Sequence, residues 1–242
     1  ADTDGDGIDD ATEGYGDSDS DGIADYLDAI DSANVLQANG GMSSQYLLES
    51  EPGLRLVLGA VAFRSGAGQA GVSTADVENY GGVTPDSGYQ YSGMLFDFIV
   101  DQLVDAGQSV DVVLPLQAAV PADAVYRKLV NGLWQDFVVD ANNRIASAPG
   151  AAGYCPPPGD SAFIPGLTEG HWCVQLAIED GGPNDADGVA NNSVADPGGI
   201  AVRLAQPVTV RVESGGGATT PWLLLLLGLL LWRARRFDRE VA

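Results

Sequence analysis

Short apolar runs separated by Gly, Pro and Asn turns dominate the chain from about residue 40 to residue 212. From Phe96 to Asp101, a large apolar residue occupies every second position, which predicts a strand with one buried face. Similar runs predict strands at 54–63, 110–116, 124–130, 133–139, 172–178 and 200–212. No long stretch has helical periodicity, although residues 74–80 favour a short helical turn. The pattern predicts a mainly β fold, an antiparallel β-sandwich of immunoglobulin-like or jelly-roll arrangement.

The most specific local signal is Asn131-Gly132 between two of these runs. Asn-Gly favours a two-residue type I′ turn, because both positions need a positive φ. This turn predicts a register that places opposite charges and aromatic residues across from each other, as stable strand pairs prefer. The expected pairs are Val130 with Leu133, Leu129 with Trp134, Arg127 with Asp136, and Tyr126 with Phe137.

A second kind of apolar run, Trp222–Trp232, stands near the C-terminus and is followed by an arginine cluster. As a helix it is about 16 Å long, whereas a bilayer core is about 30 Å thick. Positive charge stays on the cytoplasmic side, so the chain before this short helix is expected outside the cell. The alternative to a removable segment is a plain, short C-terminal anchor.

Three glycines, Gly215, Gly216 and Gly217, precede this run. The glycines, the short leucine run and the arginines together resemble the GlyGly-CTERM sorting signal of Gram-negative bacteria. The resemblance implies transient anchoring of residues 213–242 in the inner membrane and cleavage near the glycines by a rhomboid-type protease, a rhombosortase. It also implies delivery of the protein to the cell surface. We therefore exclude this segment from the predicted fold.

Negative charge is concentrated at the start of the chain. The net charge is −23, and residues 1–34 contain eleven Asp and one Glu but no Lys or Arg. A chain this acidic lacks the basic footprint that nucleic acids and anionic lipid surfaces require. The sequence starts inside the acidic stretch without an initiator Met or a signal peptide, so we expect a processed or truncated product of a longer chain.

The acidic stretch contains two calcium-loop templates of the form D-x-D-x-D-G, fifteen residues apart. Alternate carboxylates on a curled loop supply the hard oxygen ligands that Ca²⁺ prefers, and Gly at loop position 6 allows the sharp turn. Backbone carbonyls of the two isoleucines are expected as ligands, with their side chains in a small core. Asp10 and Asp25 are expected to act through water. The predicted calcium ligands are Asp2, Asp4, Asp6, Ile8, Asp10 and Glu13, then Asp17, Asp19, Asp21, Ile23, Asp25 and Asp28.

No amphipathic helix precedes either loop, as an EF-hand would require. Two such units without helices resemble thrombospondin type 3 repeats, and residues 28–34 resemble a decayed continuation. This resemblance covers residues 1–34 and implies a calcium-stiffened spacer, which without metal should be disordered through charge repulsion. The alternative is an acidic solvated tail.

Cys155 and Cys173 are the only cysteines, and outside the cell we expect them to be bonded to each other. A bridge of this loop length stabilises a fold by about 3 kcal/mol. Two free thiols in a reducing compartment are the alternative. Between Glu179 and Asp196 lies another acidic loop, in which Asp185 and Asp187 could bind a metal or could belong to an ordinary Asn/Asp/Gly loop.

A larger resemblance covers about residues 40–212. Segments 124–128, 134–138, 153–160, 170–176 and 179–188 resemble the bacterial choice-of-anchor U domain. That family precedes C-terminal sorting signals, and the resemblance implies an extracellular domain without enzymatic activity or catalytic residues to carry over.

Signals for catalysis are weak, and we predict no enzyme. Gly66–Gly71 matches G-x-G-x-x-G after a predicted strand, but no βαβ unit follows, so we interpret it as a loop. His171 is the only histidine, and no G-x-S-x-G elbow is present. Paired carboxylates are plentiful, but nothing marks one pair as special.

The sequence therefore predicts a non-enzymatic, calcium-binding structural or interaction protein of the cell surface. Its expected partners are calcium, a sorting protease, the inner membrane transiently, and a surface protein or glycan. One alternative is a calcium-dependent adhesin or carbohydrate-binding module using Trp134, Tyr89, Tyr91 and the 180–196 loop. Another is a subunit of a surface filament or layer.

Overall fold

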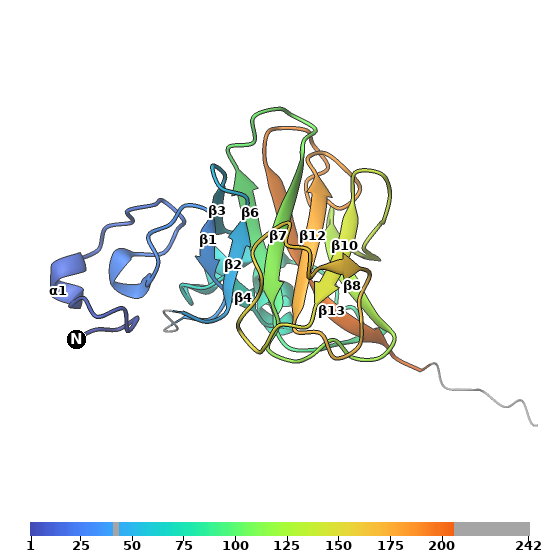
Figure 1. The fold of residues 1–242 in the computed structure, drawn as a ribbon, viewed down its shortest axis with the longest axis horizontal. Coiled ribbons are helices and arrows are strands. Elements are labelled where there is room, and N and C mark those ends of the chain that lie inside the picture. Colours follow the sequence, from blue (N-terminus) through green and yellow to red (C-terminus); the bar gives the residue numbers. More distant parts are fainter. Residues whose placement is uncertain (41–43, 206–242) are drawn as a thin grey trace, which may run out of the picture. The chain divides into compact units, whose positions relative to one another are not determined.

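In this computed structural model, which describes residues 1–40 and 44–205, two antiparallel sheets pack as a β-sandwich (Figure 1). The helices are α1 (Asp10–Glu13), η1 (Asp25–Leu27, a 3-10 turn), α2 (Ala60–Ser65) and α3 (Thr74–Gly81). The strands are β1 (Val35–Gln37), β2 (Leu47–Ser50), β3 (Arg55–Leu58), β4 (Gly71–Val72), β5 (Tyr89–Tyr91), β6 (Leu95–Asp101), β7 (Ser109–Pro115), β8 (Ala124–Val130), β9 (Leu133–Asp136), β10 (Arg144–Ala148), β11 (Ile164–Pro165), β12 (Cys173–Glu179) and β13 (Val194–Arg203).

The strands divide into one six-stranded and one seven-stranded sheet. The first sheet has the order β1-β2-β7-β12-β10-β11. The second has the order β3-β6-β13-β8-β9, and β4 and β5 extend it beside β6 and β13. The predicted mainly β, sandwich-like fold is therefore confirmed.

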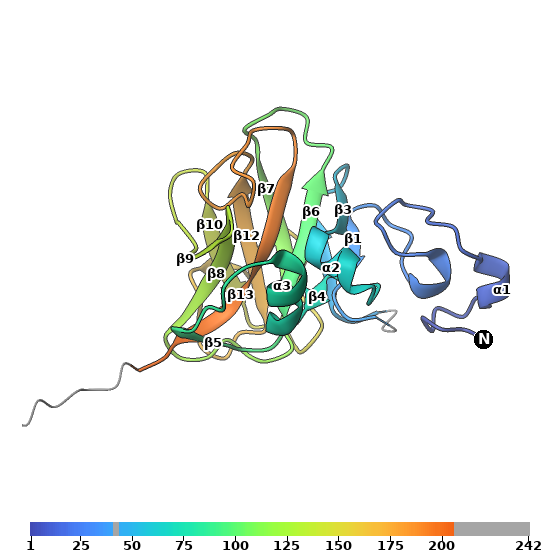
Figure 2. The same ribbon diagram turned by 180° about the vertical axis from the view of Figure 1, so that it is seen from behind.

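The core between the sheets follows the period-two pattern of the sequence. Alternate residues of β6, β7 and β12 are almost completely buried and face the other sheet: Phe96, Phe98, Val100, Val110, Val112, Leu114, Val174, Leu176 and Ile178. Burial of this kind is the main favourable contribution to folding. Figure 2 shows α2 and α3 on the outer face of the seven-stranded sheet.

The predicted strand at 54–63 is wrong in its second half. The strand β3 ends at Leu58, and α2 begins at Ala60. Asp97, from β6, explains the change because its carboxylate accepts hydrogen bonds from the backbone N–H groups of Val61 and Ala62, at 2.7 and 2.8 Å. These two donors would otherwise lack partners in the first helical turn. The G-x-G-x-x-G segment thus follows a helix rather than a strand, and it forms a loop.

The predicted hairpin is confirmed in its register. Arg127 pairs with Asp136, and Leu129 pairs with Trp134. At the turn, Asn131 and Gly132 have φ values of 50° and 77°, which a type I′ turn requires. Phe137 lies just beyond the end of β9, and its ring meets that of Tyr126 on β8 edge to face, with the ring centres 6.2 Å apart. The helical turn predicted at 74–80 is also confirmed, as α3, with a capping box from Ser73 and Asp76.

The last predicted strand begins earlier than residue 200. The strand β13 starts at Val194 and runs through Pro197, Gly198 and Gly199, residues that sequence reasoning treats as strand breakers. Both glycines are needed for close packing. A Cβ on Gly198 would lie 2.7 Å from the carbonyl oxygen of Arg127, and one on Gly199 would lie 2.7 Å from Leu95.

The predicted disulfide between Cys155 and Cys173 is present, and it joins the start of β12 to a loop 18 residues earlier. Within residues 1–40 and 44–205, no helix has the length and apolar character needed to cross a membrane. The predicted sorting segment, with Gly215, Gly216, Gly217 and the short apolar helix, lies outside the described residues.

Candidate metal centre

Two groups of three aspartates converge in the acidic segment, and they are the groups that the sequence pattern predicts. They are Asp2, Asp4 and Asp6, and Asp17, Asp19 and Asp21. In each group, one carboxylate oxygen from every residue lies within 4.8 Å of the others. Within the described part of the chain, these are the two acidic clusters with metal-like spacing.

Short-range hydrogen bonds curl each loop around its cluster. In the second loop, Ile23 N–H donates to Asp21 at 2.6 Å, and Gly22 has a φ of 97° that side chains rarely tolerate. The first loop repeats both features, with Ile8 N–H donating to Asp6 at 2.6 Å and Gly7 at 97°. The alternate carboxylates therefore point to one side of each loop.

Asp10 and Asp25, predicted to act on calcium through water, accept hydrogen bonds from the hydroxyl residue at the second position of their own loops. Both oxygens of Asp10 accept hydrogen bonds from Thr3, from its N–H and its hydroxyl, each at 2.9 Å. Asp25 binds Ser18 in the same way, at 2.7 and 3.0 Å. These carboxylates thus join the start of each loop to its end. The sequence feature that could have predicted these hydrogen bonds is the hydroxyl residue, Thr3 or Ser18, at the second position of each repeat.

Several carboxylate oxygens in the clusters are buried and have no hydrogen-bond donor among the residues that the structure describes. They are the Oδ2 atoms of Asp4, Asp19 and Asp21 and the Oε2 atom of Glu13. Asp4 and Asp21 are each only 1% exposed. A buried, unpartnered polar atom costs about 1–3 kcal/mol, and a charged one costs more. An oxygen-seeking cation is the partner that would satisfy several such atoms at once.

The pKa values of the acidic side chains also indicate that their negative charges lack a compensating positive charge. Burial, with the nearby charge of Asp28, raises the pKa of Asp21 from 3.8 to about 8. Burial also raises the pKa of Asp28 to about 7, and the charge of Asp19 contributes. In the first cluster, burial and then the charges of Asp4 and Asp6 raise the pKa of Glu13. Glu13 and Asp28 are therefore close enough to the cluster carboxylates for their charges to interact, although the converging oxygens themselves belong to three aspartates in each loop.

The two loops differ in how they contact the sandwich. Ile23 is 2% exposed and belongs to the main core, and the Asp21 carbonyl accepts a hydrogen bond from Leu58 N–H of β3 at 2.8 Å. Ile8, the equivalent residue of the first loop, is 47% exposed. The predicted burial of the isoleucine side chain is therefore right for Ile23 and wrong for Ile8. The second loop is part of the packed structure of the sandwich.

The 180–196 loop uses its acidic side chains internally. The fully buried Asp185 accepts hydrogen bonds from Gly181 N–H and Ala195 N–H, at 2.9 and 3.0 Å. Asp187 accepts from Val189 N–H and the Asn191 side chain, at 2.8 and 2.9 Å. This arrangement favours the ordinary Asn/Asp/Gly loop over the metal site considered for Asp185 and Asp187.

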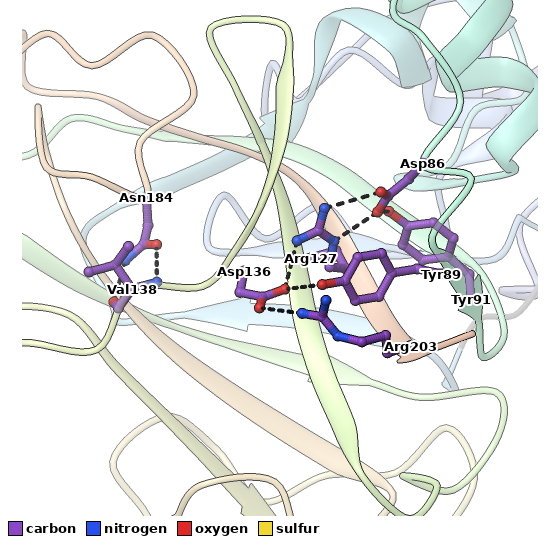
Figure 3. A network of polar contacts seen from close by, with 8 residues as sticks. All are labelled: Asp86, Tyr89, Tyr91, Arg127, Asp136, Val138, Asn184 and Arg203. Carbon is purple, nitrogen blue, oxygen red and sulfur yellow. Dashed lines mark hydrogen bonds and ion pairs between the residues drawn. The ribbon is translucent and has the colours of Figure 1, made fainter. Parts of the chain in front are cut away.

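Tyr89 and Tyr91, two of the aromatic residues considered for glycan binding, belong to a polar network (Figure 3). Arg127 donates two hydrogen bonds to Asp86 and one to Asp136, and its guanidinium lies 3.9 Å from the centre of the Tyr89 ring. Arg203 also approaches the Tyr89 ring, at 4.9 Å. Tyr91 packs on Trp134 and donates to Asp86 at 3.0 Å. The rings therefore already serve as packing surfaces for the protein's own side chains.

The single histidine also has structural partners. His171 Nδ1 lies 3.0 Å from the hydroxyl of Ser147, a pairing found in hydrolases. Ser147 is fully buried, donates to the Gly166 carbonyl at 2.8 Å and accepts from Thr168 N–H at 3.0 Å. The Ser147 hydroxyl thus holds the 166–168 loop in place, and it is too deeply buried to contact a substrate.

No protein-family model, curated protein or solved structure matches this chain. The resemblances to thrombospondin type 3 repeats, the choice-of-anchor U domain and the GlyGly-CTERM signal stay predictions. Support for a function therefore comes from the geometry of the acidic clusters.

The raised pKa values predict how the calcium-free chain responds to pH. A carboxyl group whose pKa is higher in the folded than in the unfolded state binds more protons when folded, between the two values. For Asp21 this window runs from 3.8 to about 8. We therefore expect the melting temperature of metal-stripped protein to fall between pH 5 and pH 8.5, with a smaller fall in Asp21→Asn. An equal fall in both proteins would contradict this assignment.

Proposed function

We propose that residues 1–34 form a two-site calcium module and that the chain is a non-enzymatic, calcium-binding structural or interaction protein of the cell surface. The observation that carries the proposal is the set of buried, unpartnered carboxylate oxygens on Asp4, Glu13, Asp19 and Asp21. Ca²⁺ takes six to eight oxygen ligands, and its charge would relieve the repulsion within each cluster.

The donor sets fit this ion. Asp2, Asp4, Asp6 and Glu13 would hold the first calcium, and Asp17, Asp19, Asp21 and Asp28 the second. All of these ligands are carboxylates, and the backbone carbonyls of Ile8 and Ile23 would add a neutral oxygen to each set. Sites made only of oxygen favour calcium or magnesium over softer metals.

The consequence of binding differs between the sites because, of the two loops, the second is the one packed against the sandwich. Calcium at Asp17, Asp19 and Asp21 would order a loop that continues directly into the sandwich. The next two residues are Gly22, which lies beside Leu58, and Ile23, which belongs to the core. Calcium at the first site would order the outer loop. The calcium-bound module would thus act as a stiff spacer next to the sandwich. Delivery to the cell surface would depend on the predicted sorting segment.

A calcium-dependent glycan-binding module is less well supported. It needs free aromatic faces and a metal-ready loop, whereas Tyr89 and Tyr91 pack within the protein and Asp185 binds backbone N–H groups.

Calcium titration by calorimetry on the metal-stripped chain tests the proposal. We expect two sites in the wild type and one in each of Asp6→Asn and Asp21→Asn, which change equivalent positions of the two templates. Asp187→Asn is the matched control and should keep both sites, because Asp187 bonds within its own loop. No binding heat in the wild type, or two sites in both loop variants, would contradict the proposal.

A further inference from the structure

Lys128 is the only lysine of the chain, and it has an unusual location. Its side chain lies on β8 inside the sandwich and is 0% exposed, as is that of Asp196 on the neighbouring strand β13. Charged residues are rarely buried completely, because removing an ion from water costs several kcal/mol. A buried pair contributes little net stability, so this location invites another explanation.

The strand register brings the two side chains together. Lys128 pairs with Gly198, so Asp196 is its diagonal neighbour on the same face of the sheet. The Nζ atom of Lys128 contacts Oδ1 of Asp196 and lies 3.3 Å from the Ala195 carbonyl oxygen. Gly198 keeps this space open, because a Cβ there would lie 2.8 Å from Asp196 Oδ1.

The surroundings favour the uncharged forms of both groups. Burial lowers the pKa of Lys128, although the charge of Asp196 opposes the shift. Burial likewise raises the pKa of Asp196, against the charge of Lys128. A neutral amine is a nucleophile, and a protonated carboxyl group is its electrophilic partner. Tyr126, also buried, places its hydroxyl 3.2 Å from Asp196 Oδ2, where it can donate a hydrogen bond.

We propose that Lys128 and Asp196 condense to form an intramolecular isopeptide bond between β8 and β13. The amine Nζ attacks Cγ of the carboxylic acid, and a C–N bond forms. The carboxyl hydroxyl leaves with one proton from the nitrogen, so that one water is released and no oxidant is needed. The Tyr126 hydroxyl donates a hydrogen bond to the Asp196 oxygen that becomes the carbonyl oxygen of the amide. The product carries no charge, which removes the cost of burying the ion pair.

Mass spectrometry of the full chain tests this bond directly. Beyond the two hydrogens lost in the disulfide, the intact protein should be lighter than its sequence by one water. Tryptic digestion should yield residues 128–144 joined to residues 145–203, because cleavage remains available after Arg127, Arg144 and Arg203. Lys128→Arg keeps the positive charge but cannot form the amide, and it should lose both signatures.

A second measurement does not depend on the folding of a variant. In denatured wild-type protein, an amine-reactive reagent should label one group, the N-terminal amine, because Lys128 is the only side-chain amine in the chain. Two labelled amines per chain, together with an intact mass that shows no loss of water, would overturn the proposal. Lys128 and Asp196 would then form a plain ion pair. A water loss that maps to another peptide, such as one containing Asp21-Gly22, would overturn it as well.

Discussion

Removing calcium is expected to lower the melting temperature of the chain by about 5–11 °C through the second site alone. A ligand at 100 times its dissociation constant stabilises the folded state by about 2.7 kcal/mol. For a domain of this size, each kcal/mol changes the melting temperature by about 2–4 °C. The effect reaches the sandwich because Asp21 bonds Leu58 through its carbonyl and Ile23 lies in the main core. Thermal melts with and without chelator measure it.

The two equivalent variants separate the contributions of the loops. Asp21→Asn should abolish most of the calcium-dependent shift, whereas Asp6→Asn should retain it because Ile8 is exposed. In chelator, Asp21→Asn should melt at or above the wild type, since the substitution removes a buried carboxyl group whose ionisation no cation compensates. If chelator leaves the wild-type melting temperature unchanged, or if Asp6→Asn removes the shift as fully as Asp21→Asn, calcium does not couple to the sandwich through this loop.

Replacing Arg127 with Met should lower the free energy of unfolding by about 3–5 kcal/mol, the usual cost of removing one partner from a buried ion pair. Arg127 joins β8 to Asp86 with two hydrogen bonds, at 2.8 and 3.1 Å, and to Asp136 on β9 at 2.6 Å. Without it, the carboxylate of Asp86 stays largely buried and keeps only the hydroxyl of Tyr91. The face of Tyr89 also loses its stacked guanidinium.

Chemical denaturation measures this change, and Arg144→Met is the matched control. The Arg144 side chain is 59% exposed and approaches Asp111 only at 3.7 Å, so its loss should change stability by less than about 0.5 kcal/mol. Equal effects of the two substitutions would show that the Arg127 network contributes no more than an exposed ion pair.

The sequence predicts best where a local rule acts alone. Asn131-Gly132 determines its hairpin register because the turn chemistry needs no distant partner. The aspartate spacing likewise predicts both clusters, since neighbours two residues apart curl each loop. Such patterns carry their information within about a dozen residues.

Predictions failed where a distant residue decides the structure. The apolar run at 54–63 contains a helix because Asp97, 36 residues away from Val61, accepts the N–H groups of its first turn. Gly198 lies inside a strand where β8 approaches closely, and Pro197 beside it pairs with Asp97 of β6. The pairing of Lys128 with Asp196 likewise depends on a register set between segments 68 residues apart. No window of sequence contains both partners of these contacts.

The position of β13 has a mechanical consequence. Along one edge this strand pairs with β6 at residues 194–198 and with β5 at residues 201–203, and along the other edge it pairs with β8 at residues 198–202. A pulling force applied at Arg203 along the axis of β13 would load these ladders in shear. The ladders on both edges must then slide together, instead of opening one bond at a time as they would for a strand at the edge of a sheet. We therefore expect the domain to resist tension along β13 better than tension that peels off an edge strand.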